Sequence, residues 1–211
     1  MTAVWGPLGW MTLHSVTTLY PETPTPTEKQ LLSTWLDLFR DTITCPSCRD
    51  HFTKLLAAYR QKFPELLNSR QTFMLFGFRA HNAVNQRLNK PVYGTIEDCM
   101  ATLQSNFKTR TALEYRRAYG THITRHWSGW RDITGIAALR KIAEMNKIET
   151  SYFALREGTT QVAPAPDVVV LPRGILEAVP VETSPAPPQM LSRFAPPTGF
   201  RITGGGIRLR R

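Results

Sequence analysis

Apolar residues in the first hundred positions recur at the spacing of amphipathic helices. In "LLSTWLDLFRDTI", apolar side chains stand one, three and four positions apart from Leu31 to Ile43, which predicts one such helix. We expect Thr27 to be its N-cap. The preceding segment, "PLGWMTLHSVTTLY", begins at Pro7 and ends at Tyr20 before the breaker stretch "PETPTPT". That segment predicts a helix of about three turns.

Three more helices are expected before residue 105. Pro46 suits the first turn of a helix that runs through "SCRDHFTKLLAAYR". An apolar stripe in "FMLFGFRAHNAVNQRL" predicts the next helix, and Asn89 can take a left-handed conformation at its end. "TIEDCMATLQSNF" predicts a short fifth helix with Thr95 as N-cap and Asp98 three residues on. Because nothing here alternates as a strand does, we expect an all-α fold: a four-helix bundle with a short fifth helix over residues 1–105.

The composition changes twice in the second half of the chain. Residues 106–157 are basic and rich in Tyr and Trp, and we expect a partly helical extension. Residues 158–211 are rich in Pro, which predicts an extended, largely disordered tail. Within the tail, "DVVVLP" could add a strand to another element, or it could be only a hydrophobic patch.

Charge and composition limit the classes of partner and location. The net charge of +10 is spread along the chain, so we interpret it as a solvated basic surface; attraction to a polyanion is the alternative, and nucleic acid is not expected. No Lys or Arg precedes Lys29, and no apolar run approaches the roughly 18 residues of a membrane span. We therefore expect a soluble, cytoplasmic protein.

The motif "CPSC", Cys45 to Cys48, is the first candidate for chemistry. Three cysteines are too few for a disulfide-rich secreted scaffold. Together with His51 and Cys99 the pair could bind zinc, but a second ligand pair is missing from the sequence. A redox pair fits better, because a helix N-terminus stabilises a thiolate and two intervening residues allow a disulfide to close. A thioredoxin-like fold would need a strand before the motif, whereas here a helix precedes it.

A redox pair that passes electrons to oxygen needs a mediator, and a flavin is the natural one. His81, Asn85 and Leu88 share one helix face, and Arg87 and Lys90 at the end of that helix could reach a pyrophosphate. A polar helix face in water is the alternative interpretation.

An earlier helix carries a second polar interruption. His14 stands in an otherwise apolar segment beside Trp10, and Gly77 would let a ring approach the backbone of the later helix. Ordinary core residues are the alternative interpretation of the histidine and the tryptophan.

Three segments in this order, "WGPLGWMTLHSVTTLYP", "CPSC" and "HNAVNQRLNKPVY", resemble the Erv/ALR family of FAD-linked sulfhydryl oxidases. The resemblance covers roughly residues 4–104. It implies a four-helix bundle with a short fifth helix that holds FAD, usually as a homodimer. It also implies that the protein oxidises protein dithiols to disulfides and reduces oxygen to hydrogen peroxide. By the same matching, Cys48 lies beside the flavin and Cys45 meets the substrate.

The resemblance also implies the cofactor site and some departures from it. The FAD-binding residues would be Gly6, Trp10, His14, Tyr20, His81, Asn82, Val84, Asn85, Arg87, Leu88, Lys90 and Tyr93. Many cellular members carry a structural disulfide where this chain has Phe78 and Thr95, and a separate shuttle CxxC that this chain lacks. This form, without the structural disulfide and the shuttle CxxC, is most similar to versions encoded by large cytoplasmic DNA viruses. We then expect action in the host cytoplasm on virion proteins, and the protein could associate with the virion or capsid.

Two points stay open from the sequence. The chain could instead be a non-catalytic virion or interaction protein that keeps a relic oxidase bundle. Cys99 is expected to be a small buried hydrophobic residue, with an intermolecular or resolving thiol as the alternative.

Overall fold

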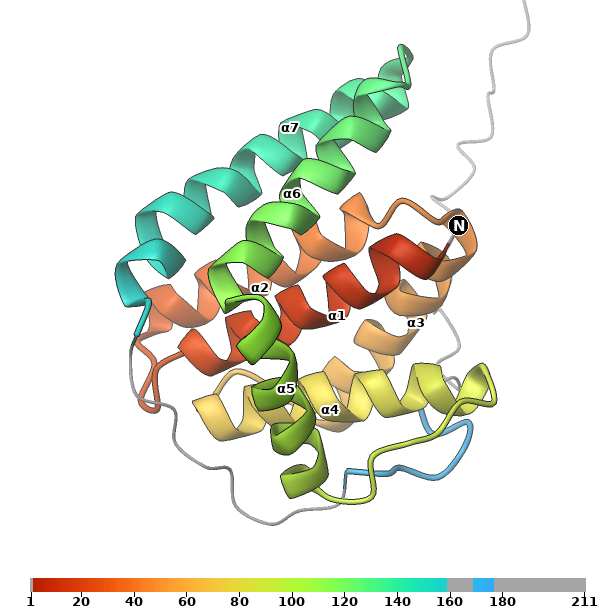
Figure 1. Cartoon of the computed structure of the whole chain (residues 1–211), viewed down its shortest axis with the longest axis vertical. Coiled ribbons are helices and arrows are strands. Elements are labelled where there is room, and N and C mark those ends of the chain that lie inside the picture. The colour runs from red at the N-terminus through yellow and green to blue at the C-terminus, as the bar shows by residue number, and fades with distance from the viewer. Residues whose placement is uncertain (1, 159–168, 177–211) are drawn as a thin grey trace, which may run out of the picture. The chain divides into compact units, whose positions relative to one another are not determined.

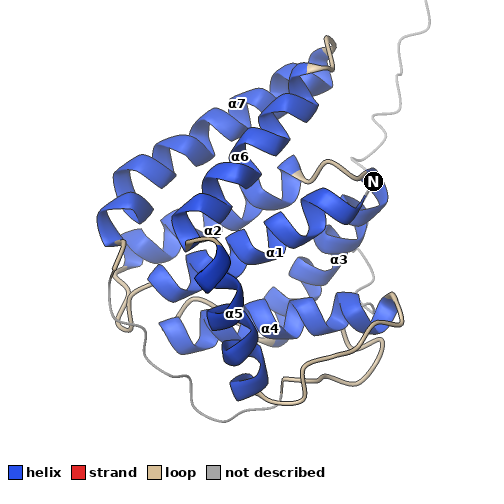
Figure 2. Ribbon diagram, in the orientation of Figure 1, coloured by secondary structure: helices blue, strands red, loops and turns tan. Residues whose placement is uncertain are grey.

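The computed structural model describes residues 2–158 and 169–176, and in this part of the chain every regular element is helical (Figure 2). The α-helices are α1 (Thr2–Leu19), α2 (Pro26–Thr42), α3 (Pro46–Lys62), α4 (Arg70–Arg87), α5 (Ile96–Thr109), α6 (Ala112–Ser128) and α7 (Ile133–Ile148). A π-helical turn, Glu149–Phe153, and a 3-10 turn, Ala154–Arg156, follow α7. The all-α prediction is confirmed. None of the described helices is long and apolar enough to cross a membrane.

Local capping explains most helix boundaries, and one predicted cap is wrong. The Thr25 hydroxyl accepts the Glu28 N–H and the Glu28 carboxylate accepts the Thr25 N–H, so α2 begins at Pro26. Thr27 therefore lies inside the helix rather than capping it. The Thr95 cap of α5 is confirmed, with Thr95 and Asp98 bonded reciprocally.

One hydrophobic core joins the first four helices to α6 and α7, while the buried residues of α5 belong to a second cluster with Met74 and Phe78 of α4. In Figure 1, α1 packs against α4 and α6, while α2 packs against α3 and α7. Leu36 of α2, Phe76 of α4, Tyr119 of α6 and Ile142 of α7 belong to one buried cluster. Residues 106–157, expected to be a partly helical extension, thus form a hairpin of long helices that shares the core of the bundle.

A short stretch near the C-terminus packs on α4. We call Val169–Leu176 the C-terminal strap (blue in Figure 1). It is neither helix nor strand, yet Val169 and Leu176 are 1% and 3% exposed. The Gln86 side chain donates to the Leu171 carbonyl at 3.1 Å, and Asn82 Nδ2 donates to the Val169 carbonyl at 3.4 Å. The described part of "DVVVLP" therefore packs on α4 without forming a strand, although it belongs to the segment that was expected to be a disordered tail. The rest of that tail lies outside the described residues.

Candidate functional site

The CPSC pair forms a disulfide at the start of α3. Cys45 is the N-cap of the helix and Pro46 its first residue, so the prediction that the pair lies at a helix N-terminus is confirmed. The Cα atoms of Cys45 and Cys48 are 5.2 Å apart, and the Cys48 N–H points to Cys45 Sγ at 3.4 Å. Once the bond is reduced, the positive end of the helix dipole would stabilise a thiolate here.

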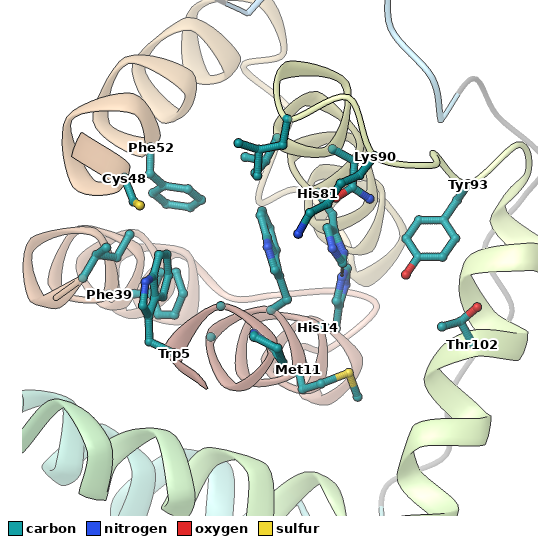
Figure 3. A pocket seen from close by; sticks show the side chains of 18 of the residues that line it. Trp5, Met11, His14, Phe39, Cys48, Phe52, His81, Lys90, Tyr93 and Thr102 are labelled. Carbon is teal, nitrogen blue, oxygen red and sulfur yellow. Dashed lines mark hydrogen bonds between the residues drawn. The ribbon is translucent and has the colours of Figure 1, made fainter. Parts of the chain in front are cut away.

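The two sulfur atoms face different surroundings. Cys48 lines a cavity of about 590 Å³, whereas Cys45 lies outside that lining. Figure 3 shows the Cys48 sulfur directed toward the Phe52 ring, with Phe39 and Trp5 nearby. The cavity volume is within the usual range for a site that takes a small molecule or cofactor.

The structure gathers almost all of the predicted cofactor residues around this cavity. They come from the N-terminal part of α1, from α4 and from the connection that follows α4. The lining includes Gly6, Trp10, His14, His81, Val84, Asn85, Arg87, Leu88, Lys90 and Tyr93.

Tyr20 and Asn82 lie outside the lining. The Tyr20 hydroxyl donates to the Leu67 carbonyl at 2.9 Å, where it ties the end of α1 to the α3–α4 connection. Asn82 accepts the Tyr93 N–H at 2.9 Å and donates to the Tyr93 carbonyl at 3.0 Å. Its side chain therefore holds the backbone of a lining residue in place.

Two histidines from α1 and α4 form the centre of one cavity wall. His14 Nε2 and His81 Nδ1 are 3.1 Å apart, and the Trp10 indole stacks on the His81 ring with centroids 4.2 Å apart. Burial and then His81 lower the pKa of His14 well below its usual value. Burial and then Lys90 lower the pKa of His81 to about 4. Both rings are therefore neutral at pH 7, so one donates and the other accepts.

At Gly77 the ring that approaches α4 is that of His14, and Gly77 itself is not part of the cavity lining. A Cβ at Gly77 would lie 3.2 Å from Nδ1 of His14, closer than most such contacts, so α1 and α4 approach closely at this level. Nδ1 of His14 and Nε1 of Trp5 are buried and have no hydrogen-bond partner among the described residues. Buried polar atoms in folded proteins are nearly always satisfied, so a polar ligand in the cavity is a natural partner for Nε1 of Trp5, whereas Nδ1 of His14 faces α4 at Gly77.

The end of the cavity away from Cys48 is polar and cationic. Lys90, Tyr93 and Thr102 lie there in Figure 3, and Arg87 also contributes to the lining. None of the described lining residues is Asp or Glu. This end suits a phosphate-bearing group.

The sequence did not point to several other lining residues. Phe39 and Ile43 belong to the apolar stripe of α2, which predicted burial but not a cavity wall. Asn106 of α5 and Tyr115 of α6 carry no signal, because they reach the cavity only through the way that their helices pack.

Two other roles were considered for the cysteines: binding of a metal ion, and for Cys99 a resolving or intermolecular thiol. No group of three or more His, Cys, Asp or Glu side chains suited to a metal ion occurs among the residues that the structure describes. Cys99 is buried beside Ile96 and Leu103, in a different cluster from Cys48. Burial, followed by the charge of Asp98, raises the pKa of Cys99 to about 12, so its thiol stays protonated at neutral pH.

Comparisons with known proteins agree with this geometry. Residues 8–111 match the model of the Erv1/Alr family. Over 88 residues the chain is 36% identical to the FAD-linked sulfhydryl oxidase of an African swine fever virus isolate, an alignment that covers 42% of this chain and 71% of that protein. A second isolate's protein of the same name is 33% identical over 105 residues, which cover 50% and 85% of the two chains. The FAD-linked sulfhydryl oxidase ERV2 of Saccharomyces cerevisiae is 32% identical over 99 residues, 47% of this chain and less than half (46%) of the yeast protein.

Proposed function

This chain belongs to the Erv1/Alr family, and on that premise we propose that it is an FAD-dependent sulfhydryl oxidase. Its substrates would be protein dithiols, its electron acceptor oxygen, and its products protein disulfides and hydrogen peroxide. One observation carries the proposal: the Cys45–Cys48 disulfide has one sulfur on the wall of the cavity and the other outside it. A thiol-to-flavin relay needs that asymmetry.

The cavity fits FAD in its chemistry as well as its volume. The apolar rings near Cys48 suit the isoalloxazine, and Arg87 and Lys90 supply positive charge for the diphosphate. Nε1 of Trp5 is a buried polar atom that the cofactor can satisfy. When bound, FAD would accept two electrons from a dithiol and pass them to oxygen, chemistry that thiols carry out poorly by themselves.

We propose that substrate meets Cys45 first. A substrate thiolate attacks Cys45 Sγ, the Cys45–Cys48 bond breaks, and Cys48 leaves as a thiolate at the N-terminus of α3, where the helix dipole stabilises it. A second substrate thiolate attacks the mixed disulfide and releases Cys45. The substrate has then lost two electrons and two protons, and the Cys45/Cys48 pair holds the two electrons beside the cavity.

The test combines cofactor analysis with turnover. Purified full-length protein should release flavin on denaturation, and with dithiothreitol it should consume one oxygen and form one peroxide for each disulfide made. Cys45→Ser and Cys48→Ser should each lower turnover by more than about a thousandfold, because each removes half of the exchanging pair.

Cys99→Ser is the matched control, since that thiol is buried and is not part of the cavity lining, and its turnover should equal that of the wild type. Colourless protein without flavin, or a Cys48→Ser variant with full turnover, would contradict the oxidase proposal. The second result would favour a relic bundle in a non-catalytic interaction protein.

Homodimer formation, a cytoplasmic location and association with a virion or capsid stay proposals that rest on the family resemblance. Light scattering coupled to size exclusion would measure the mass in solution. Fractionation of expressing cells would test the location, and co-purification with particles would test the association.

A further inference from the structure

The turn between α6 and α7 carries a group of exposed apolar side chains. Trp130 is 46% exposed, Ile133 86% and Ile136 50%, and we call these three residues the hairpin patch. Ile133 and Ile136 stand three apart in the first turns of α7, so they share a face of that helix. Adjoining exposed apolar residues on a protein surface commonly mark a contact site.

Packing fixes the hairpin patch close to the redox disulfide. The Trp127 indole N–H donates to the Thr42 carbonyl at 2.9 Å, and Thr42 ends α2 three residues before Cys45. The Arg49 guanidinium, one residue after Cys48, lies 5.5 Å from the centre of the Trp127 ring. The rings of Trp127 and Trp130 are 5.6 Å apart.

These contacts set an upper limit on the distance from the disulfide to the patch. Three residues of chain span at most about 11 Å, and the Thr42–Trp127 hydrogen bond and the two indole rings add to that span. The Trp130 ring therefore lies within roughly 25 Å of Cys45, the reach of about seven extended residues. In Figure 1 the turn between α6 and α7 projects past the C-terminal end of α2. A polypeptide that presents a cysteine to Cys45 can therefore lay neighbouring residues on the patch.

The charge beside the patch favours an acidic partner. Arg125 and Arg131 are exposed, and Asp132 is the one acidic residue between positions 125 and 136. The Asp132 carboxylate caps α7 by accepting the Gly135 N–H at 2.8 Å. These arginines place positive charge before and after Trp130 in the chain, and that charge would attract carboxylates and repel basic segments.

We propose that the hairpin patch is the docking surface for the substrate polypeptide, namely an extended dithiol segment with apolar side chains and carboxylates within about seven residues of its reacting cysteine. The inference rests on the proposed oxidase function and specifies its substrate class. A chain that has not yet formed its disulfides exposes such apolar residues, whereas a small dithiol has nothing to place on the patch. The patch should therefore affect the KM for polypeptides and leave small dithiols unaffected.

The test compares two substrates on full-length protein. One is dithiothreitol, and the other is a reduced CxxC peptide with Leu and Glu placed about seven residues from its cysteines. In an Ile133→Ser/Ile136→Ser variant, kcat/KM for the peptide should fall about tenfold through KM, while oxidation of dithiothreitol should be unchanged. Leu155→Ser is the matched control: Leu155 is 75% exposed but lies after α7, so the variant should behave as wild type with both substrates.

A charge exchange tests the acidic preference. Arg131→Glu should lower kcat/KM for the peptide with Glu and should raise kcat/KM for the same peptide with Lys in place of Glu. Calorimetry would measure the binding of a peptide that has Ser in place of its cysteines. The Ile133→Ser/Ile136→Ser variant should bind this peptide more weakly than the wild type does. That measurement reads docking without turnover.

Each result separates the two proposals. Equal loss with dithiothreitol and peptide, or no loss with either, would overturn docking at the patch. A change in oligomeric mass with unchanged peptide kinetics would assign the patch to contact between copies of this chain and also overturn it. A wild-type protein that fails to oxidise dithiothreitol would contradict the oxidase proposal itself, and the binding measurement would still decide whether the peptide docks.

Discussion

Cys45 and Cys48 are the same residue type three positions apart, and the cavity distinguishes them. Only Cys48 is part of its lining, while Cys45 is partly exposed and is followed by the exposed Pro46 and Ser47. The helix N-terminus acts on both sulfurs, so position rather than electrostatics assigns them different partners.

The His14–His81 pair makes stability depend on pH. The pKa of His81 in the folded protein is about 4, below the usual 6.5, so the unfolded chain binds its proton first as the pH falls. The free energy of unfolding should therefore be unaffected above about pH 6.5 and should fall between pH 6.5 and about 4, by on the order of 3 kcal/mol for His81. Urea denaturation at several pH values would measure it.

His81→Gln supplies the comparison for that prediction. The variant keeps a polar side chain against His14 but loses the titrating ring, so its stability should change less across this range. An identical slope in wild type and variant would show that His81 does not cause the effect.

At the scale of the elements, α4 is held on its outer side by the C-terminal strap. Asn82 bonds both to Tyr93, which lines the cavity, and to the strap at Val169. One buried amide thus links the cofactor side of the α4–α5 connection to a segment more than eighty residues further along the chain.

We predict that Val169→Asp weakens FAD binding on the order of tenfold, because a carboxylate among Ile96, Met74 and Phe78 is costly to bury and the strap would separate from α4. Fluorescence titration of the flavin would measure the dissociation constant. Val170→Asp is the control, since that neighbouring side chain is only partly buried and the loss should be smaller. Equal affinities in wild type and Val169→Asp would mean that the strap does not support the cavity.

At the scale of the whole molecule, the α6–α7 hairpin and the bundle depend on one core. Arg116 of α6 is buried and forms ion pairs with Glu149 and Glu157, and its guanidinium also donates to Ser15 Oγ of α1 at 3.3 Å. Leaving any of these charges without its partner would be unfavourable, so the hairpin is expected to unfold together with α1.

Ile142→Ala should accordingly destabilise the entire described unit. Ile142 of α7 is 2% exposed, and truncation of such a side chain costs about 2–5 kcal/mol. We expect a single unfolding transition at a lower denaturant concentration than in the wild type. The transitions followed by circular dichroism and by flavin release should coincide. Ile136→Ala, at a side chain that is 50% exposed, should change stability by less than about 0.5 kcal/mol. Two separate transitions would indicate that the bundle folds independently of the hairpin.

What the sequence determined about this protein is local in origin. Helical periodicity, Pro46 after Cys45 and the reciprocal cap at Thr95 depend on residues within a few positions of one another, and the structure agrees with them. The start of the first helix differs, because α1 begins at Thr2 and contains Pro7, which was expected to begin it. The cap at α2 was misplaced by two residues because Thr25 and Thr27 both precede suitable partners, and only the hydrogen bonds distinguish them.

The tertiary structure alone decided the features that need segments far apart in the chain. Asn82 does not line the cavity; its side chain bonds to the backbone of Tyr93 and Val169, which come from other segments of the chain. The packing of Trp127 against Thr42 joins positions 85 residues apart and brings the hairpin patch to the disulfide. Composition and periodicity describe which face of a helix is apolar, but they do not say which other helix covers it; that choice depends on the complementary shapes of side chains in the folded core.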